Sequence, residues 1–237
     1  MKKILLIILL LPLFIHAQNG QYLGAGSATT KLLLHLNGNS TDVSGNGNNG
    51  TDANITYGLG NGKFFAGAGF NGTTSKIRCS SAISFTGNFT ISFWIYMNDN
   101  TDIMCVNKGQ AGSSYSQFLL QIINGRLNFT VYSANNAANE KTVTSTDSLI
   151  NNKWYNIIVT RDGTNNNIYF DGKLSNYTPW ALSQWNSAEY IYIGHQIYAG
   201  NPYSVLNGKL DEAIIESKAW TFSEITKYVT FAKGRFE

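Results

Sequence analysis

Clustered positive charge is the first thing that this sequence lacks. Its 237 residues include 17 Lys and Arg against 14 Asp and Glu, and 13% of all residues are charged. Lys2 and Lys3 lie in the first 17 residues, so the rest of the chain has 15 basic against 14 acidic residues. Nucleic acids and anionic membranes attract clustered Lys and Arg, which displace counterions. The near-neutral composition therefore argues against both as partners.

Cysteine and histidine are scarce as well. The only Cys are Cys79 and Cys105, and the only His after the first 17 residues are His35 and His195. This set lacks the CxxC and HExxH spacings of zinc sites, so no zinc centre is predicted. In an oxidising compartment a Cys79–Cys105 disulfide is one interpretation. Two half-buried free thiols are the other, because Cys packs well as a small apolar residue.

Long apolar runs are absent except at the N-terminus. Two lysines precede the run Ile4–Ile15, and the small residue Ala17 follows it. These features are typical of a secretory signal peptide, residues 1–17, because a membrane span needs roughly 20 apolar residues. We therefore expect export to the periplasm or the extracellular space, with no membrane insertion after cleavage. A short leader segment, 18–30, and one domain, 31–237, would follow.

Catalytic signatures are also missing. Retaining glycosidases need two carboxyl groups about 5–5.5 Å apart, and no acid here has another acid two positions away on one strand face. On a regular strand, Asp211 and Glu212 would point to opposite faces. A GxSxG elbow and a nucleotide-binding loop are absent too. We expect no catalytic residues; the alternative is a carboxylate pair from two strands, as in a glycoside hydrolase, or a polysaccharide lyase.

The apolar residues form short alternating runs, which predict strands. Turn sequences such as Asn124-Gly125 and Asp171-Gly172 separate them and supply the positive φ of tight hairpins. One short helix is expected over Thr221–Phe231, with a polar cap ahead of Glu224. This pattern predicts an all-β fold, a two-sheet antiparallel jelly roll with one C-terminal helix. The expected strands are Lys31–Leu36, Lys63–Phe70, Ser75–Cys79, Phe89–Met97, Asp102–Lys108, Gln117–Ile122, Arg126–Tyr132, Trp154–Arg161, Asn167–Phe170, Tyr190–Gly194 and Lys209–Glu216.

Aromatic residues divide into two groups. Trp94 and Trp154 fall inside expected strands and are predicted core residues, and Trp220 is predicted to pack the helix against a sheet. The segment Tyr177–Tyr203 has no convincing strand pattern over most of its length, and exposed rings stack well on the flat faces of sugars. The alternative is that this segment folds over a sheet and buries its tryptophans. The predicted ligand-binding residues are Tyr177, Trp180, Trp185, Tyr198 and Tyr203.

Asparagine is abundant, with 28 residues, mostly in expected loops. One interpretation is turn chemistry. The other is that the amides present paired donors and acceptors to sugar hydroxyls.

Four segments in this order and spacing resemble the laminin-G-like domains of the concanavalin A-like lectin/glucanase superfamily. They are Leu33–Thr51 (LLHLNGNSTDVSGNGNNGT), Phe89–Met97 (FTISFWIYM), Lys153–Lys173 (KWYNIIVTRDGTNNNIYFDGK) and Asn207–Ile225 (NGKLDEAIIESKAWTFSEI). The resemblance covers nearly the whole chain after the signal peptide and implies a two-sheet jelly roll. Such domains are commonly noncatalytic modules of secreted proteins that bind glycans or protein ligands, often with bound calcium.

The resemblance also implies where calcium would bind. Asp42, in the loop Asn37–Gly50, and Asp211 occupy positions similar to those of calcium ligands in relatives. Relatives frequently have Asp where this chain has Asn37, and losing that charge should weaken the site. The alternative is that Asp42 caps its own turn.

These observations predict a secreted, noncatalytic, lectin-like module that binds a glycan or polysaccharide, with calcium as a candidate cofactor. The alternative is a structural or adhesion protein that binds a cell-envelope or extracellular protein, or a virion component. Fold alone does not separate these functions.

Overall fold

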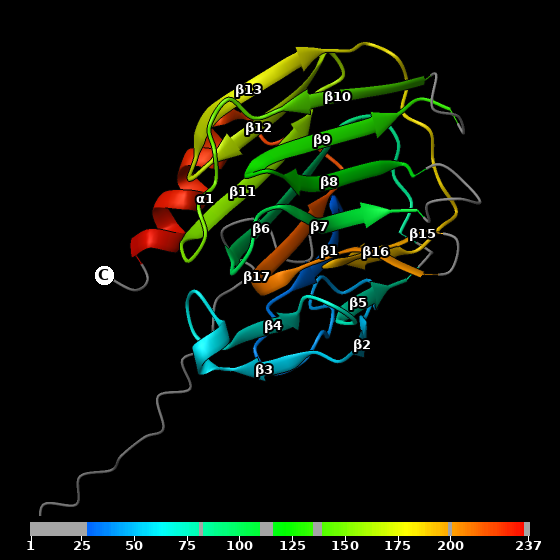
Figure 1. Cartoon of the computed structure of the whole chain (residues 1–237). Helices are drawn as coiled ribbons and strands as arrows, with labels where there is room; N and C mark the ends of the chain where they lie inside the picture. Colours follow the sequence, from blue (N-terminus) through cyan, green and yellow to red (C-terminus); the bar gives the residue numbers. More distant parts are fainter. Residues whose placement is uncertain (1–27, 81–82, 110–115, 135–138, 199–200, 235–237) are drawn as a thin grey trace, which may run out of the picture.

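The computed structural model describes residues 28–80, 83–109, 116–134, 139–198 and 201–234 (Figure 1). The expected signal peptide and most of the expected leader segment lie outside these ranges. Side chains at positions 197–198, 201–203 and 233–234 are also outside the described set. Within the described ranges, no helix is long and apolar enough to cross a bilayer.

Two antiparallel sheets form the body of the molecule, which confirms the predicted two-sheet fold (Figure 1). Sheet A has the order β13-β12-β11-β6-β17-β4-β3, and β1 also pairs with β17. Its strands are β1 (Thr30–Leu34), β3 (Thr56–Gly58), β4 (Gly67–Asn71), β6 (Phe89–Met97), β11 (Trp154–Arg161), β12 (Asn165–Phe170), β13 (Lys173–Pro179) and β17 (Asn207–Glu216).

Sheet B has the order β10-β9-β8-β7-β14-β5-β2. Its strands are β2 (Thr51–Ala53), β5 (Lys76–Cys79), β7 (Asp102–Lys108), β8 (Phe118–Ile123), β9 (Arg126–Tyr132), β10 (Glu140–Thr144) and β14 (Ile191–Ile193). A separate hairpin joins β15 (His195–Tyr198) to β16 (Asn201–Val205), and a 3-10 turn, η1 (Leu59–Asn61), precedes β4.

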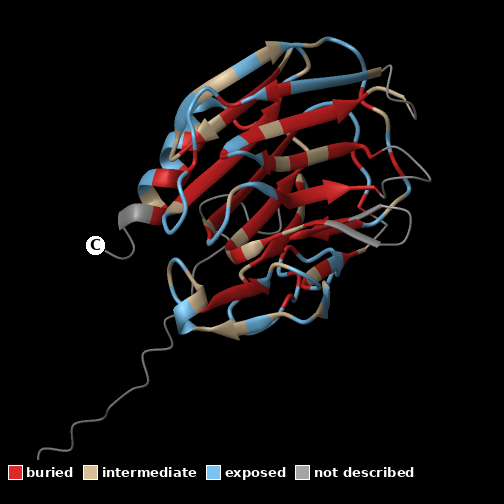
Figure 2. Ribbon diagram, in the orientation of Figure 1, coloured by how far each residue is buried: buried red, intermediate tan, exposed pale blue. Residues whose placement is uncertain are grey.

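The core lies between the two sheets, where Figure 2 shows buried residues along the facing strands. Strand β6 illustrates the cause, because its alternation turns Phe89, Ile91, Phe93 and Ile95 inward, all at most 1% exposed. Each such side chain contributes about 1.5–3 kcal/mol through removal from water. The opposite face of β6 is the outer face of sheet A.

The helix α1 (Phe222–Gly234) packs on that outer face. Thr221 and Glu224 form a capping box, because Thr221 Oγ1 accepts from the Glu224 N–H and Glu224 Oε2 accepts from the Thr221 N–H. The predicted role of Trp220 is confirmed, since it joins a buried cluster of helix and sheet residues. The cluster contains Leu33, Ile158, Ile214, Trp220, Ile225, Tyr228 and Val229.

The tight turns also follow the prediction. Asn124 and Gly125 have φ of 49° and 76°, and Asp171 and Gly172 have φ of 51° and 82°. The Asp171-Gly172 turn leads into β13, a strand that was not expected. No residue of β13 is fully buried, so its sequence carries little apolar alternation. Tyr177 therefore lies on an edge strand and not in a loop.

Candidate functional site

The segment that carries the predicted ligand-binding aromatics crosses from sheet A to sheet B. Tyr177 stands on β13 and is 54% exposed. The Trp180 N–H then donates to Thr164 O (2.7 Å) beside the β11–β12 turn, and the Trp185 N–H donates to Tyr132 O (2.9 Å) at the end of β9. The chain next joins sheet B as β14. Tyr177, Trp180 and Trp185 are therefore spread along a segment that passes from one sheet to the other.

Two buried cations hold this crossing segment. The Arg161 guanidinium lies 5.1 Å from the Trp180 ring centroid, and it donates to Trp180 O (3.1 Å) and to Leu182 O. Lys108 is fully buried and donates to Ser187 O. Burial lowers the pKa of both cations. Trp180 is half-buried and also packs against the main core. The geometry of Trp180 thus matches the alternative in which the segment folds over the sheets.

The remaining predicted aromatics do not complete one platform among the described residues. Trp185 is half-buried. The backbones of Tyr198 and Tyr203 belong to β15 and β16, but their side chains lie outside the described set. Of Tyr177, Trp180 and Trp185, Tyr177 is the most exposed.

Asp42, the first predicted calcium ligand, is buried and saturated with hydrogen bonds. Its Oδ1 accepts from the N–H groups of Leu33 and Ser44, each at 3.0 Å. Its Oδ2 accepts from the Ser44 hydroxyl (2.9 Å) and the Asn48 N–H (2.8 Å). An ionised carboxylate has about four acceptor positions. Asp42 therefore organises its own loop.

Asp211, the second predicted ligand, is 1% exposed on the outer face of sheet A. Its Oδ2 accepts from the N–H groups of Lys63 (2.8 Å) and Phe64 (3.2 Å). Its Oδ1 is buried with no hydrogen-bond partner among the described residues. Burial, and then the charge of Glu212, raise the pKa of Asp211 to about 7.

A β-bulge changes the expected direction of Glu212. The register of β17 shifts between Asp211 and Ile214, and Glu212 has φ 52°. Glu212 consequently shares the outer side of the sheet with Asp211, where both carboxylates raise the pKa of Tyr228, after the larger effect of burial. Glu212 Oε2 lies 2.7 Å from His35 Nδ1. The expectation of opposite faces is wrong, because it assumes unbroken alternation.

Calcium takes about six to eight oxygen ligands, and Asp42 has no acceptor position left for it. Among the described residues, no group of three or more His, Cys, Asp or Glu could hold a metal ion. Calcium binding at Asp211 stays a prediction.

Of the two interpretations of Cys79 and Cys105, the structure has the free thiols and not the disulfide. Cys79 lies on β5 and Cys105 on β7, and β14 runs between these strands. Strands two apart are separated by about 9.6 Å, whereas bridged cysteines have Cα atoms about 4.4–6.8 Å apart. Both thiols are free and buried, and burial raises the pKa of each.

A second surface, not predicted from the sequence, lies on the outer face of sheet A. Cross-strand partners run from β3 to β11: Thr56 faces Gly69, Gly69 faces Lys209, Lys209 faces Tyr96, and Tyr96 faces Trp154. We name these five residues the outer-face row. Strands lie about 4.8 Å apart, so the row is roughly 19 Å long.

One end of the row is aromatic. The Tyr96 and Trp154 ring centroids are 5.7 Å apart, with an interplanar angle of 56°, and both residues are partly exposed. Lys209 Nζ lies 4.8 Å from the Tyr96 centroid and donates to Gly60 O at 2.7 Å. Trp94, on the same face, is 2% exposed and confirms its predicted core position. Trp154 was predicted to lie in the core, but it is the first residue of β11 and is partly exposed at the end of that strand.

Asparagine amides flank the row where the strands end. Asn207 faces Asn71 across β17 and β4, and Asn98 Nδ2 donates to Asn207 Oδ1 at 3.0 Å. The Tyr96 hydroxyl donates to Asn152 Oδ1 at 3.3 Å. Each amide offers both donors and an acceptor. Residues far apart in the sequence thus form a line of amides beside the aromatic pair.

The other end of the row is a depression of about 180 Å³. A Cβ on Gly69 would lie 2.6 Å from Thr56 Oγ1 and 2.8 Å from Asn61 Nδ2, so the missing side chain makes room for Asn61. Most of the residues that line it are polar, and the set is Asn54, Thr56, Asn61, Gly69, Phe70, Asn71, Asn98, Gly208 and Lys209.

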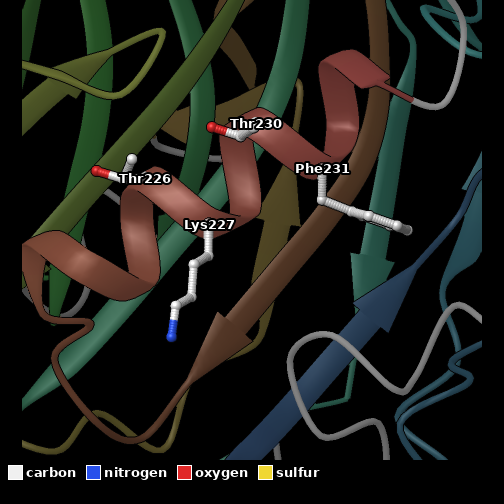
Figure 3. A pocket seen from close by; sticks show the side chains of 4 residues that line it. All are labelled: Thr226, Lys227, Thr230 and Phe231. Carbon is white, nitrogen blue, oxygen red and sulfur yellow. The ribbon is translucent and has the colours of Figure 1, made fainter.

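Two larger depressions suit a ligand less well. One of about 360 Å³ is lined, among the described residues, by α1 alone, with Thr226, Lys227, Thr230 and Phe231 (Figure 3). In Figure 3, Lys227 and Phe231 extend from one side of the helix, and Thr226 and Thr230 are the other labelled side chains of the lining.

The other, of about 340 Å³, brings together Asp147, Asp171 and Lys173. Asp171 begins a hairpin turn, and its Oδ1 accepts from the Asn156 N–H at 2.9 Å. This carboxylate therefore has a structural role.

The fold and this surface define a jelly-roll β-sandwich with an aromatic and amide-lined outer face. The chain belongs to the concanavalin A-like lectin/glucanases superfamily, whose laminin G family model matches residues 70–226. No curated protein matches the chain in sequence.

Solved structures show the same fold at low sequence identity. The binding domain of Paraclostridial mosquitocidal protein 1 has a TM-score of 0.68 and 16% identity over 86% of this chain, which spans 52% of that structure. Domain 4 of AbnA, a GH43 extracellular arabinanase from Geobacillus stearothermophilus solved with arabinotriose, has a TM-score of 0.68 and 16% identity. The match covers 85% of this chain and 98% of that domain. The botulinum neurotoxin serotype D binding domain has a TM-score of 0.64 and 18% identity, and the match covers 86% of this chain and 51% of that structure. This chain therefore spans about half the length of the toxin binding domains.

Proposed function

We propose that the protein is an exported, noncatalytic carbohydrate-binding module whose ligand lies along the outer-face row. The observation that carries the proposal is the register of sheet A, which places the Tyr96–Trp154 pair, Lys209 and a line of asparagine amides side by side. Support comes from domain 4 of the arabinanase, which has this fold and was solved with arabinotriose.

The chemistry of the row suits a sugar chain. The flat apolar face of a sugar ring stacks on exposed aromatic rings, at about 0.5–1.5 kcal/mol per ring beyond area burial. The asparagine amides pair with sugar hydroxyls, because each amide is both donor and acceptor. With two rings, a dissociation constant of order 0.1–1 mM is expected.

The test is a glycan screen followed by titration of single variants. Trp154→Ala and Tyr96→Ala should each weaken binding several-fold, while the melting temperature stays within a few degrees because both rings are partly exposed. Tyr177→Ala is the matched control, since it removes an exposed aromatic ring from β13.

Each contrary outcome has a clear meaning. Loss of binding only in Tyr177→Ala would move the site to the crossing segment. Absence of binding to any glycan at millimolar concentration would favour a structural or adhesive protein. Release of reducing sugar from mixed polysaccharides would contradict the noncatalytic assignment, and an intact Met1 on native protein, in place of a start near Gln18, would contradict export.

A further inference from the structure

The ammonium groups of two lysines lie over the rings of two neighbouring aromatic residues on the outer face of β6. Lys63 Nζ lies 5.3 Å from the Trp94 ring centroid, and Lys209 Nζ lies 4.8 Å from the Tyr96 centroid. Trp94 and Tyr96 are two residues apart on one face, which is about 6.8 Å along the strand. Both ammonium groups therefore lie on the outer face beside the aromatic end of the row.

No carboxylate neutralises these lysines in the part of the chain that the structure describes. The ion pairs there join His35 to Glu212 and Lys218 to Glu224. The contact of Lys63 with Asp211 is made by the backbone N–H and not by the ammonium group.

The acids beside these lysines make their contacts elsewhere. Asp211 is 1% exposed, and its Oδ2 accepts from the backbone N–H groups of Lys63 and Phe64. Glu212 Oε2 lies 2.7 Å from His35 Nδ1. The ammonium groups of Lys63 and Lys209 therefore lie beside the aromatic end of the row without an ion pair to either acid.

Lys209 is also held in place for a ligand. Gly60 O takes one of its three ammonium donors, and Tyr96 lies beneath the charge. Lys209 further lines the polar depression with Asn61, Asn71 and Asn98. A negative group next to the aromatic pair would therefore meet a charged donor and neutral amides together.

We infer that the ligand of the outer-face row is an acidic polysaccharide, with a uronate carboxylate placed between Lys63 and Lys209. This inference rests on the proposed function and names its ligand class. The lysines supply charge, whereas the rings and amides supply affinity that a neutral sugar would share.

The experiment is a calorimetric titration with a galacturonate oligomer and with a galactose oligomer of the same length. At about 0.05 M salt the acidic oligomer should bind several-fold more tightly. At about 1 M salt, where the screening length is roughly 3 Å, the difference should disappear.

The variants Lys63→Gln and Lys209→Gln should each reduce the ratio of affinities for the acidic and the neutral oligomer. Lys63→Gln, which lies outside the outer-face row, should also leave binding of the neutral oligomer intact. Lys209→Arg keeps the charge and should keep the preference. Lys141→Gln is the matched control, because Lys141 is exposed on β10 of the other sheet. Melting curves identify any variant that fails to fold.

Equal binding of the two oligomers would overturn this inference and leave the proposed function standing. A preference that survives both Lys→Gln changes and high salt would also overturn it. Failure of every glycan to bind would instead remove the proposed function itself.

Discussion

The buried carboxyl group of Asp211 should make stability fall as the pH rises. The pKa of Asp211 is raised from 3.8 to about 7 in the folded protein, mainly by burial. Between these values the folded state holds a proton that the unfolded chain has lost. The linked stability is therefore complete below pH 4 and is lost as the pH rises through about 7.

The magnitude follows from the size of the shift. About three pKa units correspond to roughly 4 kcal/mol in total, of which about 2–3 kcal/mol falls between pH 5 and pH 8. In a domain of this size, 1 kcal/mol shifts the melting temperature by about 2–4 °C. The effect should therefore be of the order of 5–10 °C.

The assay compares melting temperatures of the wild type and Asp211→Asn at pH 5 and pH 8. Asparagine keeps an oxygen for the N–H groups of Lys63 and Phe64 but cannot ionise. We expect the melting temperature of Asp211→Asn to rise relative to that of the wild type between pH 5 and pH 8. Other buried groups also titrate, such as His195, because burial lowers its pKa to about 4. Both proteins share these groups, so their effect drops out of the difference between the two melting temperatures.

Asp147→Asn, at an exposed carboxylate, is the control and should change nothing. Parallel melting curves of the wild type and Asp211→Asn across this pH range would refute the reasoning.

Three further outcomes test the structure. Trp180→Ala should cost about 3 kcal/mol of stability, because its ring packs on the core and on Arg161; a melting temperature near that of the wild type would mark Trp180 as a surface platform. A reducing agent should leave the melting temperature unchanged, and Cys79 and Cys105 should react with a thiol reagent only after unfolding; one bridge per chain in mass spectra would contradict this. Thr221→Ala should cost about 1 kcal/mol by removing the helix cap, measured by denaturant unfolding; an unchanged midpoint would show that packing alone holds α1.

Local sequence patterns were sufficient for most strands. The runs Phe89–Met97, Asp102–Lys108, Arg126–Tyr132 and Trp154–Arg161 have the predicted bounds, because each alternates or fills a buried strand with β-branched and aromatic residues. The edge strand β13 was not predicted, because none of its residues is buried and exposed positions need no apolar alternation that would reveal a strand in the sequence. Such strands exist because a neighbour supplies backbone hydrogen bonds.

The candidate site depends on information that is spread along the chain. Gly69, Tyr96, Trp154 and Lys209 carry no shared motif, and they become neighbours only through the registers of four strands. The sequence left open whether Cys79 and Cys105 are bridged for a related reason, since β14, more than 80 residues after Cys105 in the sequence, separates the two cysteine strands.

The sequence by itself determined the all-β class, the hairpin turns, the capped helix and the family, because these follow from local periodicity, glycine conformation and short motifs. Tertiary structure alone decided which side chains share a face. Strand order and register bring Lys209 beside Tyr96, and a single bulge at Glu212 reverses the direction of a carboxylate. A shift of one residue exchanges the two faces of a strand, so site geometry in a sheet is a property of the whole fold.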